Sequence, residues 1–272
     1  MWNTTKSTVP QQLRLTDPGV REQLEKLPAS QILIGHGTDG QPVCVDLDDD
    51  APHVLVCTAT GGGTSTVLRT LTAQLLHQGG HVLVLDSKRI SQVWAQPLPT
   101  VTYRRDTDDI HTALLGLRTE LERRAHHADK HGDVEDLPWL TVVFESAGHT
   151  LRQLARHWAK VRQPGEAMTS PAVDAYEELL FTGRATRIHF LVGAPDYRPG
   201  LLREQFSTVL LGRVTTRTWN QAAPQVTTVP KASTRPGRFH TVQGSTAHPT
   251  QVLLMSETEA AAWAAAPQTA AG

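Results

Sequence analysis

The sequence predicts an α/β fold in which helices flank a mostly parallel central sheet. Short apolar runs such as HVLVLD and WLTVVFE are typical of buried strands, and they alternate with segments of helical periodicity. The chain has 272 residues, of which 39% are hydrophobic and 19% charged, so it can bury a substantial core. Strands and helices that alternate in this way pack as layers around one sheet.

The first part of the chain, residues 1–30, is polar and is expected to form an N-terminal arm. Within the arm, residues 17–27 are a short helical candidate, for which Thr16 or Asp17 is a suitable N-terminal cap. A hairpin is expected after the arm, because an Asp-Gly pair separates two apolar runs and favours a tight turn.

The elements that follow the hairpin define the parallel sheet. The hairpin strands are predicted at 31–35 and 42–47, and the later strands at 53–57, 81–86, 139–145, 188–194 and 207–214. The intervening helices are predicted at 65–77, 108–128, 151–161 and 172–181. Each helix is long enough to cross from one strand to the next parallel strand.

The C-terminal part differs from the centre of the chain. Residues 223–236 are rich in Pro and Thr and are expected to be irregular. The runs GRFHTVQG and TQVLLM then indicate a small strand pair, and an Ala-rich helix is expected at 257–266. We therefore expect a small C-terminal extension over residues 223–272.

Charge and cysteine content narrow the classes of function. The net charge is −1, so contact with nucleic acid would depend on a local basic patch. Cys44 and Cys57 lie in apolar runs and form no metal-binding pattern, as expected for reduced core residues of a cytoplasmic protein. No apolar run approaches the ~20 residues that span a bilayer, so we expect no direct membrane insertion.

The stretch CTATGGGTSTVLRT has the layout of a phosphate-binding loop. A strand leads into three glycines, whose backbone N–H groups can approach a phosphate, and a helix follows. Ser65 carries the hydroxyl that would bind Mg²⁺, but Thr64 stands where the GxxxxGK[ST] pattern has its lysine, and Thr58 where it has its first glycine. The candidate nucleotide-binding residues of the loop are Thr60, Gly61, Gly62, Gly63, Thr64, Ser65 and Thr66.

Seven segments in register resemble the motor domain of the FtsK/SpoIIIE/Tra family of DNA translocases. They are ILIGHGTDGQPVCVDLDDDAPHVLV, TATGGGTST, VLVLDSKR, ELERRA, VVFESAGH, RIHFLVGAPDYRP and GRVTTRTWNQ. The resemblance, actinobacterial in character, implies a RecA-like P-loop NTPase fold over residues 31–222, with ATP and Mg²⁺ as cofactors and assembly as a ring around double-stranded DNA.

The departures from the family pattern fall on groups that carry charge in the family. VVFESAGH stands where the family has VVIDEFAD, and we assign Phe144 to the place of the Mg²⁺-orienting aspartate. Glu145 is then the retained carboxylate that activates water, and Pro195 replaces a glutamine. Lys88, at the end of the adjacent strand, could partly substitute for the lysine missing at Thr64.

Two sets of basic residues are candidates for contacts with partners. Arg213 and Arg217 fall where the resemblance implies arginines that reach a neighbouring subunit, for catalysis or for ordinary ion pairing. Arg152, Arg156 and Lys160 repeat every four residues and lie along one helical face. They could contact DNA phosphates or an acidic partner, or simply be a solvated helix face.

The resemblance and its departures together indicate a nucleotide-binding domain with a degenerate ATPase site. We expect an accessory or inactive paralogue in a DNA-translocation or DNA-transfer assembly, as part of a homo-oligomeric ring or docked on an active FtsK-like homologue. Two alternatives remain open at this stage: an active ATP-driven translocase of double-stranded DNA, and a structural interaction protein that binds no nucleotide.

Overall fold

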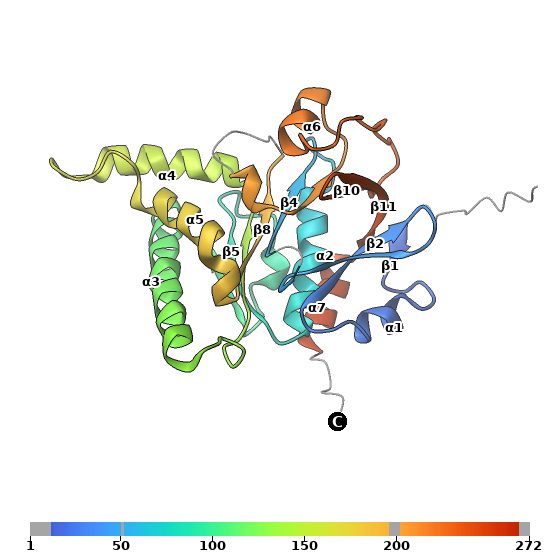
Figure 1. The fold of residues 1–272 in the computed structure, drawn as a ribbon, viewed down its shortest axis with the longest axis horizontal. Helices are drawn as coiled ribbons and strands as arrows, with labels where there is room; N and C mark the ends of the chain where they lie inside the picture. Colours follow the sequence, from blue (N-terminus) through green and yellow to red (C-terminus); the bar gives the residue numbers. More distant parts are fainter. Residues whose placement is uncertain (1–11, 50–51, 196–201, 267–272) are drawn as a thin grey trace, which may run out of the picture.

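A single 11-stranded sheet organises the protein (Figure 1). The computed structural model describes residues 12–49, 52–195 and 202–266. In chain order its strands are β1 (Leu13–Arg14), β2 (Gln31–Gly37), β3 (Pro42–Asp46), β4 (His53–Cys57), β5 (His81–Leu85), β6 (Val101–Arg104), β7 (Leu140–Phe144), β8 (Ile188–Gly193), β9 (Thr208–Leu211), β10 (Arg238–Gln243) and β11 (Thr246–Leu254). The α-helices are α1 (Val20–Glu25), α2 (Thr64–His77), α3 (Thr107–His131), α4 (Ala147–Val161), α5 (Pro171–Thr182), α6 (Thr216–Ala222) and α7 (Glu257–Ala265).

The sheet has a parallel part and an antiparallel part. Its order is β3-β2-β11-β10-β9-β4-β8-β7-β5-β6, with β1 paired to β11. From β9 to β6 all neighbours are parallel, which confirms the predicted mostly parallel α/β sheet. The predicted C-terminal strand pair continues this sheet, because β10 pairs with β9 and β11 pairs with the N-terminal hairpin. The sequence analysis did not predict β1, β6 or α6.

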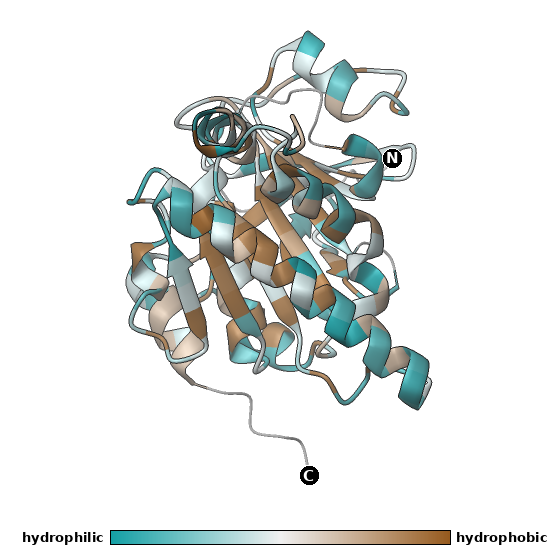
Figure 2. Ribbon diagram, turned by 90° about the vertical axis from the view of Figure 1, so that its left-hand side faces the viewer, coloured by the Kyte–Doolittle hydropathy of each residue, from teal (hydrophilic) through white to brown (hydrophobic). Residues whose placement is uncertain are grey.

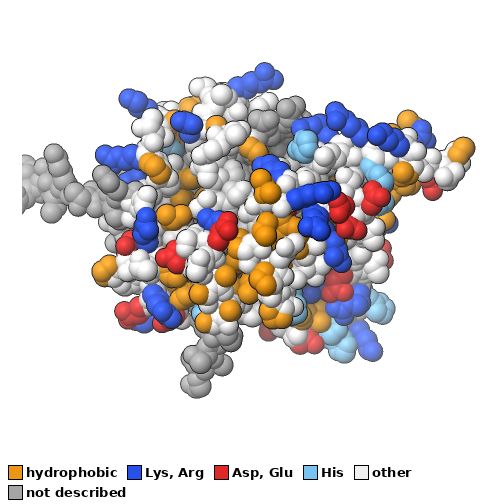
Figure 3. Space-filling model, turned by 180° about the vertical axis from the view of Figure 1, so that it is seen from behind, with side chains coloured by type: hydrophobic (Ala, Val, Ile, Leu, Met, Phe, Trp, Pro, Cys, Tyr) orange, Lys and Arg blue, Asp and Glu red, His pale blue; other side chains and the backbone are white. Residues whose placement is uncertain are grey.

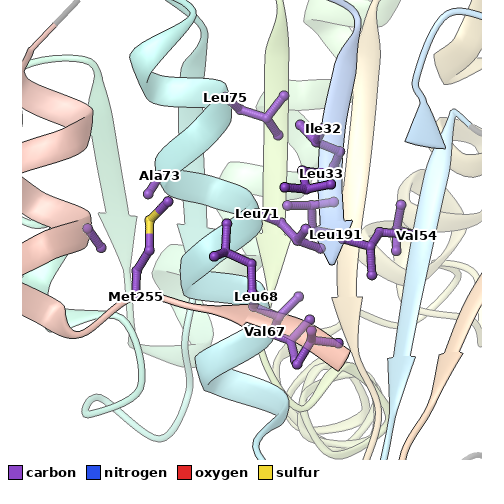
Figure 4. Packing of buried hydrophobic residues seen from close by; sticks show 14 of the residues in the cluster. Ile32, Leu33, Val54, Val67, Leu68, Leu71, Ala73, Leu75, Leu191 and Met255 are labelled. Carbon is purple, nitrogen blue, oxygen red and sulfur yellow. The ribbon is translucent and has the colours of Figure 1, made fainter. Parts of the chain in front are cut away.

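Two hydrophobic clusters fill the two faces of the sheet. On one face α2 packs its buried leucines against β2, β4 and β8, as Leu68 and Leu71 do beside Leu33 and Leu191 (Figure 4). On the other face α3, α4 and α5 cover apolar strands and turn their polar sides outward (Figure 2). Helices on both faces leave only the ends of the parallel strands for a site.

The N-terminal arm differs from its prediction. Helix α1 begins at Val20, and its N-cap is Gly19 with a φ of 78°, so neither Thr16 nor Asp17 caps it. The Asp17 carboxylate instead accepts a hydrogen bond from the backbone N–H of Arg14 at 2.8 Å. A turn before the helix therefore takes the carboxylate that the sequence offered as a cap, and residues 1–11 of the arm lie outside the described residues.

The amino ends of β4 and β8 hold two buried neutral histidines. The backbone N–H of Phe190 donates to Nδ1 of His53 at 3.1 Å, so the other ring nitrogen carries the proton and donates to the carbonyl of Leu180 at 2.9 Å. His189 lies against the carbonyl of Pro52 at 3.0 Å. Burial lowers the pKa of His53 to about 4 and that of His189 to about 3.

Candidate functional site

The glycine loop connects β4 directly to the first turn of α2. Gly61 and Gly63 have φ values of 75° and 98°, in the left-handed region that side chains disfavour. Gly63 is the N-cap of α2, and no side chain of the described residues caps the helix there. The first backbone N–H groups of α2 are therefore available to an anion, and the helix dipole favours negative charge at this point.

Gly62 is required for a different reason, because the loop folds back on itself. Its N–H donates to the carbonyl of Ala59 at 2.8 Å. A Cβ added at Gly62 would lie 2.1 Å from Oγ1 of Thr58 and 2.7 Å from the carbonyl oxygen of Ala59. The three glycines thus form a tight turn in which backbone, and no side chain, faces outward.

The carboxyl end of β7 places Glu145 beside the start of α2. Glu145 is 1% exposed, and the hydroxyl of Ser65 donates to its Oε2 at 3.2 Å. Nε2 of Gln92 donates to Oε1 of Glu145 at 2.7 Å, and Gln92 is itself held by the indole N–H of Trp94 at 2.6 Å. Burial raises the pKa of Glu145, while these two hydrogen bonds act in the opposite direction.

The assignment of Phe144 to the Mg²⁺-orienting position is wrong. Side chains alternate along a strand, and Phe144 lies on the face of the sheet opposite α2. Its ring packs edge to face on Tyr176 with centroids 5.6 Å apart. The carboxylate that contacts Ser65 of the loop is Glu145. The next residue in the chain is Ser146, which carries no charge.

Lys88 lies near Glu145 and is not among the residues that line the cavity over the glycine loop, which is described below. Its side chain is exposed after β5, and its charge is among the influences that lower the pKa of Glu145. The nearby Asp86 is fully buried and accepts hydrogen bonds from the hydroxyl of Tyr103 at 2.6 Å and from the N–H of Ser91 at 2.7 Å. The lysine is thus placed to balance the buried carboxylate of Glu145.

A cavity of about 320 Å³ opens over the glycine loop. Gly61, Gly62, Gly63 and Thr66 line it, as predicted candidates, while Thr60, Thr64 and Ser65 are not among its lining residues. The facing wall comes from the chain before and within β10 and from β11. Volume and composition are suited to a ligand of nucleotide size.

Three arginines line this cavity, namely Arg213, Arg235 and Arg238. Arg213 follows β9, and its carbonyl accepts the N–H of Ala59 at 2.9 Å, so the ends of β9 and β4 lie side by side. Sequence reasoning missed Arg235 and Arg238 because Arg235 belongs to a segment interpreted as irregular and Arg238 follows it closely. The run STRPGR, with two arginines before a strand, was the available signal.

The remaining basic candidates lie away from the cavity. Arg217 is exposed on α6 and does not line it. Helix α4 starts next to Ser146 and projects from the sheet, with Arg156 and Lys160 exposed and Arg152 half-buried (Figure 1). Lys and Arg side chains gather along the upper edge of the molecule toward this projection (Figure 3). The ion pairs of the described residues include none of these four side chains.

Over the described ranges, none of the helices combines the length and apolar composition that crossing a membrane requires.

Comparisons with known proteins bear on the family likeness and the fold of the chain. Residues 21–135 match the sequence profile of the FtsK/SpoIIIE family. The DNA translocase SftA of Bacillus subtilis (strain 168) is 27% identical over 194 aligned residues, which cover 59% of this chain and 20% of that protein. The chain therefore spans about a fifth of the length of this curated relative.

Solved structures share the fold at low sequence identity. The pCW3 conjugation coupling protein TcpA, in its monomer form with ATPγS, superposes with a TM-score of 0.74 at 18% identity over 93% of this chain and 72% of its own. EssC (ATPases 2 and 3) from Geobacillus thermodenitrificans gives 0.73 at 14% identity, over 94% of this chain and 51% of its own. In residues 21–135 the chain is thus similar to the FtsK/SpoIIIE family, and over most of its length it shares the α/β fold of these ATPase structures.

Proposed function

We propose that this domain binds a nucleoside triphosphate at the glycine loop, hydrolyses it poorly, and serves as an accessory subunit of a DNA-translocation or DNA-transfer assembly. The observation that carries the proposal is the contrast at the start of α2. Gly61, Gly62 and Gly63 form a backbone cradle for phosphate. The residue after the cradle, Thr64, carries no charge, and neither does Ser146, the residue after the loop-facing carboxylate.

The cradle fits a polyphosphate. Gly62 leaves no room for a Cβ, and the uncapped N-terminus of α2 offers N–H donors. Ser65 and Glu145 are an oxygen pair of the kind that holds Mg²⁺, which would supply charge neutralisation at the phosphates when bound. The residues present therefore fit both ATP and Mg²⁺.

The same residues support slow turnover. Phosphoryl transfer relies on positioning and charge, and a unit charge about 4 Å from a phosphate contributes roughly 4 kcal/mol at an effective dielectric of about 20. Thr64 removes the loop cation. Glu145, held by Ser65 and Gln92, is the carboxylate beside the loop, and a second carboxylate does not follow it in the chain. We therefore expect these substitutions to lower the rate of hydrolysis more than the affinity for nucleotide.

Steady-state ATP hydrolysis with and without duplex DNA tests the proposal, together with the thermal unfolding midpoint in Mg·ATP. We expect an increase in the midpoint, because a ligand of the folded state stabilises it by RT ln(1 + [L]/Kd), and no DNA-stimulated turnover. The Gly62→Asp variant, which places a side chain and a negative charge in the cradle, is expected to lose the increase.

Active translocation is the second candidate, and the retained contact between Ser65 and Glu145 favours it. DNA-stimulated hydrolysis that disappears in Glu145→Gln would support that candidate and refute slow turnover. A midpoint that does not respond to nucleotide far above any physiological concentration would instead support a structural protein that binds none.

The assembly itself is tested by mass. Light scattering with and without nucleotide and duplex DNA distinguishes a ring from a monomer, since a ring multiplies the mass of the 272-residue chain. We expect association only in the presence of an active FtsK-like homologue. A ring formed by this chain alone on DNA would favour active translocation.

A further inference from the structure

Three arginines around the cavity stand outside the ion pairs of the described residues. The ion pairs within residues 12–49, 52–195 and 202–266 include neither Arg213 nor Arg235 nor Arg238. The buried Nε of Arg238 donates to no acceptor within that part of the chain. A buried N–H without an acceptor is costly, and because Arg238 also lines the cavity, a ligand bound there could accept from it.

Backbone contacts fix where these cations stand. Gly237 lies between two of them with a φ of 71°, and a Cβ there would be 2.5 Å from Nε2 of Gln251. The carbonyl of Gly237 accepts the N–H of Val252 at 2.9 Å, which ties the turn to β11. The turn is therefore tied to the sheet, and Arg235 and Arg238 on either side of it line the cavity.

Charge repulsion acts between Arg235 and Arg238. Burial, and then the charge of Arg235, lower the pKa of Arg238, which means that the protonated side chains interact unfavourably. Arginine remains protonated in spite of such a shift, so an anion between the side chains relieves the repulsion. A ligand with several negative charges gains most from this arrangement.

We propose that Arg213, Arg235 and Arg238 replace the missing loop lysine and bind the phosphates of a nucleoside di- or triphosphate that rests on Gly61–63. The proposal rests on the proposed nucleotide-binding function and adds the source of its positive charge. The positive charge then comes from the chain after β9 and from the start of β10 with the residues before it, instead of from helix α2. Guanidinium groups bind phosphate oxygens in pairs, so triphosphate is favoured over diphosphate, and monophosphate binds weakly.

Titration with a fluorescently labelled ATP or ADP measures these contributions. Arg213→Ala and Arg238→Ala are each expected to weaken binding roughly 10- to 100-fold, the loss expected for a hydrogen bond to a charged group. Arg105→Ala is the matched control, because Arg105 is an exposed arginine outside the cavity lining, and its variant should bind as the parent does. Circular dichroism melts check that each variant is folded.

A compensating variant gives a second readout. Thr64→Lys restores a cation within the loop, so it is expected to recover most of the affinity that Arg213→Ala loses and to change the parent less. Unchanged affinity in the arginine variants, while Gly62→Asp still abolishes binding, overturns the arginine assignment and leaves nucleotide binding standing. No binding by the parent chain overturns both.

Discussion

The two ends of the parallel sheet differ in how far side chains cover their polar groups. At the amino ends of β4 and β8, His53 is hydrogen-bonded through both ring nitrogens, and Trp139 stacks on His189 with ring centroids 4.7 Å apart. At the carboxyl ends, the glycine loop and three arginines surround a cavity of about 320 Å³. At the amino end both histidines are fully buried, although Nε2 of His189 has no partner among the described residues, whereas at the carboxyl end the arginines line an open cavity.

The comparison shows how polar groups that stabilise the fold differ from polar groups that are suited to bind a ligand. Groups that stabilise a fold satisfy one another, as Leu180, Phe190 and His53 do. Groups that bind a ligand are held by the backbone and keep donors for it, as we propose for the glycines and arginines of the cavity. The buried Glu145 lies between these extremes, because Gln92 and Ser65 already donate hydrogen bonds to its carboxylate.

The largest expected effect comes from Phe144, which an interpretation by motif alone would change to aspartate in order to restore an active site. Because the ring is fully buried against Tyr176, Phe144→Asp would bury an unpaired charge and leave a cavity. We expect a loss of more than about 4 kcal/mol in the free energy of unfolding, measured by urea titration. Phe144→Leu, on the order of 1 kcal/mol, is the control, and a stable Phe144→Asp domain would contradict the placement.

Lowering the pH is expected to destabilise the protein through the two buried histidines at the amino end of the sheet. The folded-state pKa values of His53 and His189, about 4 and about 3, lie below the ordinary value of 6.5, so the unfolded chain binds protons first as pH falls. Stability is complete above pH 6.5 and is lost below it, by roughly 2 kcal/mol per histidine at about pH 5. Glu145, whose pKa is raised, acts in the opposite direction.

Urea unfolding at about pH 7.5 and about pH 5 measures this loss. His189→Asn keeps a side-chain N–H for the carbonyl of Pro52 and removes one titrating group, so about half of the pH dependence should disappear. Equal stability of the parent at both pH values would mean that these rings are protonated in the folded protein.

At the carboxyl end, Gly62→Ala tests how tightly the loop is folded. The added Cβ would meet Thr58 at 2.1 Å, and we expect a cost of about 1 to 3 kcal/mol in unfolding free energy. Gly116→Ala is the matched control, since a Cβ at this helical glycine of α3 meets nothing within 4 Å and should stabilise by up to about 1 kcal/mol. Equal changes in the unfolding free energy of both variants would show that the loop can accommodate a Cβ at Gly62.

The smallest effect on stability is expected on α4. Replacing Arg152, Arg156 and Lys160 by glutamine should change the free energy of unfolding by less than about 0.5 kcal/mol, because two of the three side chains are exposed. If they bind DNA phosphates, the slope of log affinity against log salt concentration falls by about 0.9 for each phosphate that the variant no longer neutralises. Identical salt slopes in parent and variant would mean that these side chains do not contact DNA and form a solvated helix face.

The sequence predicted the central elements well and the site only in part. The glycine loop and the helix after it could be predicted because they depend on residues that are near one another in the chain. Phe144 was misassigned by one residue, since VVFESAGH set letter by letter on VVIDEFAD places Glu145, and not Phe144, opposite the aspartate. The cationic wall was missed because Arg235 and Arg238 lie at the start of a strand whose partner no local pattern identifies.

The sequence by itself determined the alternation of strands and helices and the tight turn at Gly61–63, because periodicity and glycine conformation act over a few residues. Only the tertiary structure decided what faces that turn. Strand β10 pairs with β9, and β9 pairs with β4, so chain more than 140 residues away in sequence comes to rest over the loop. Such pairing follows from burial of whole strand faces, which short spacings in the sequence do not encode.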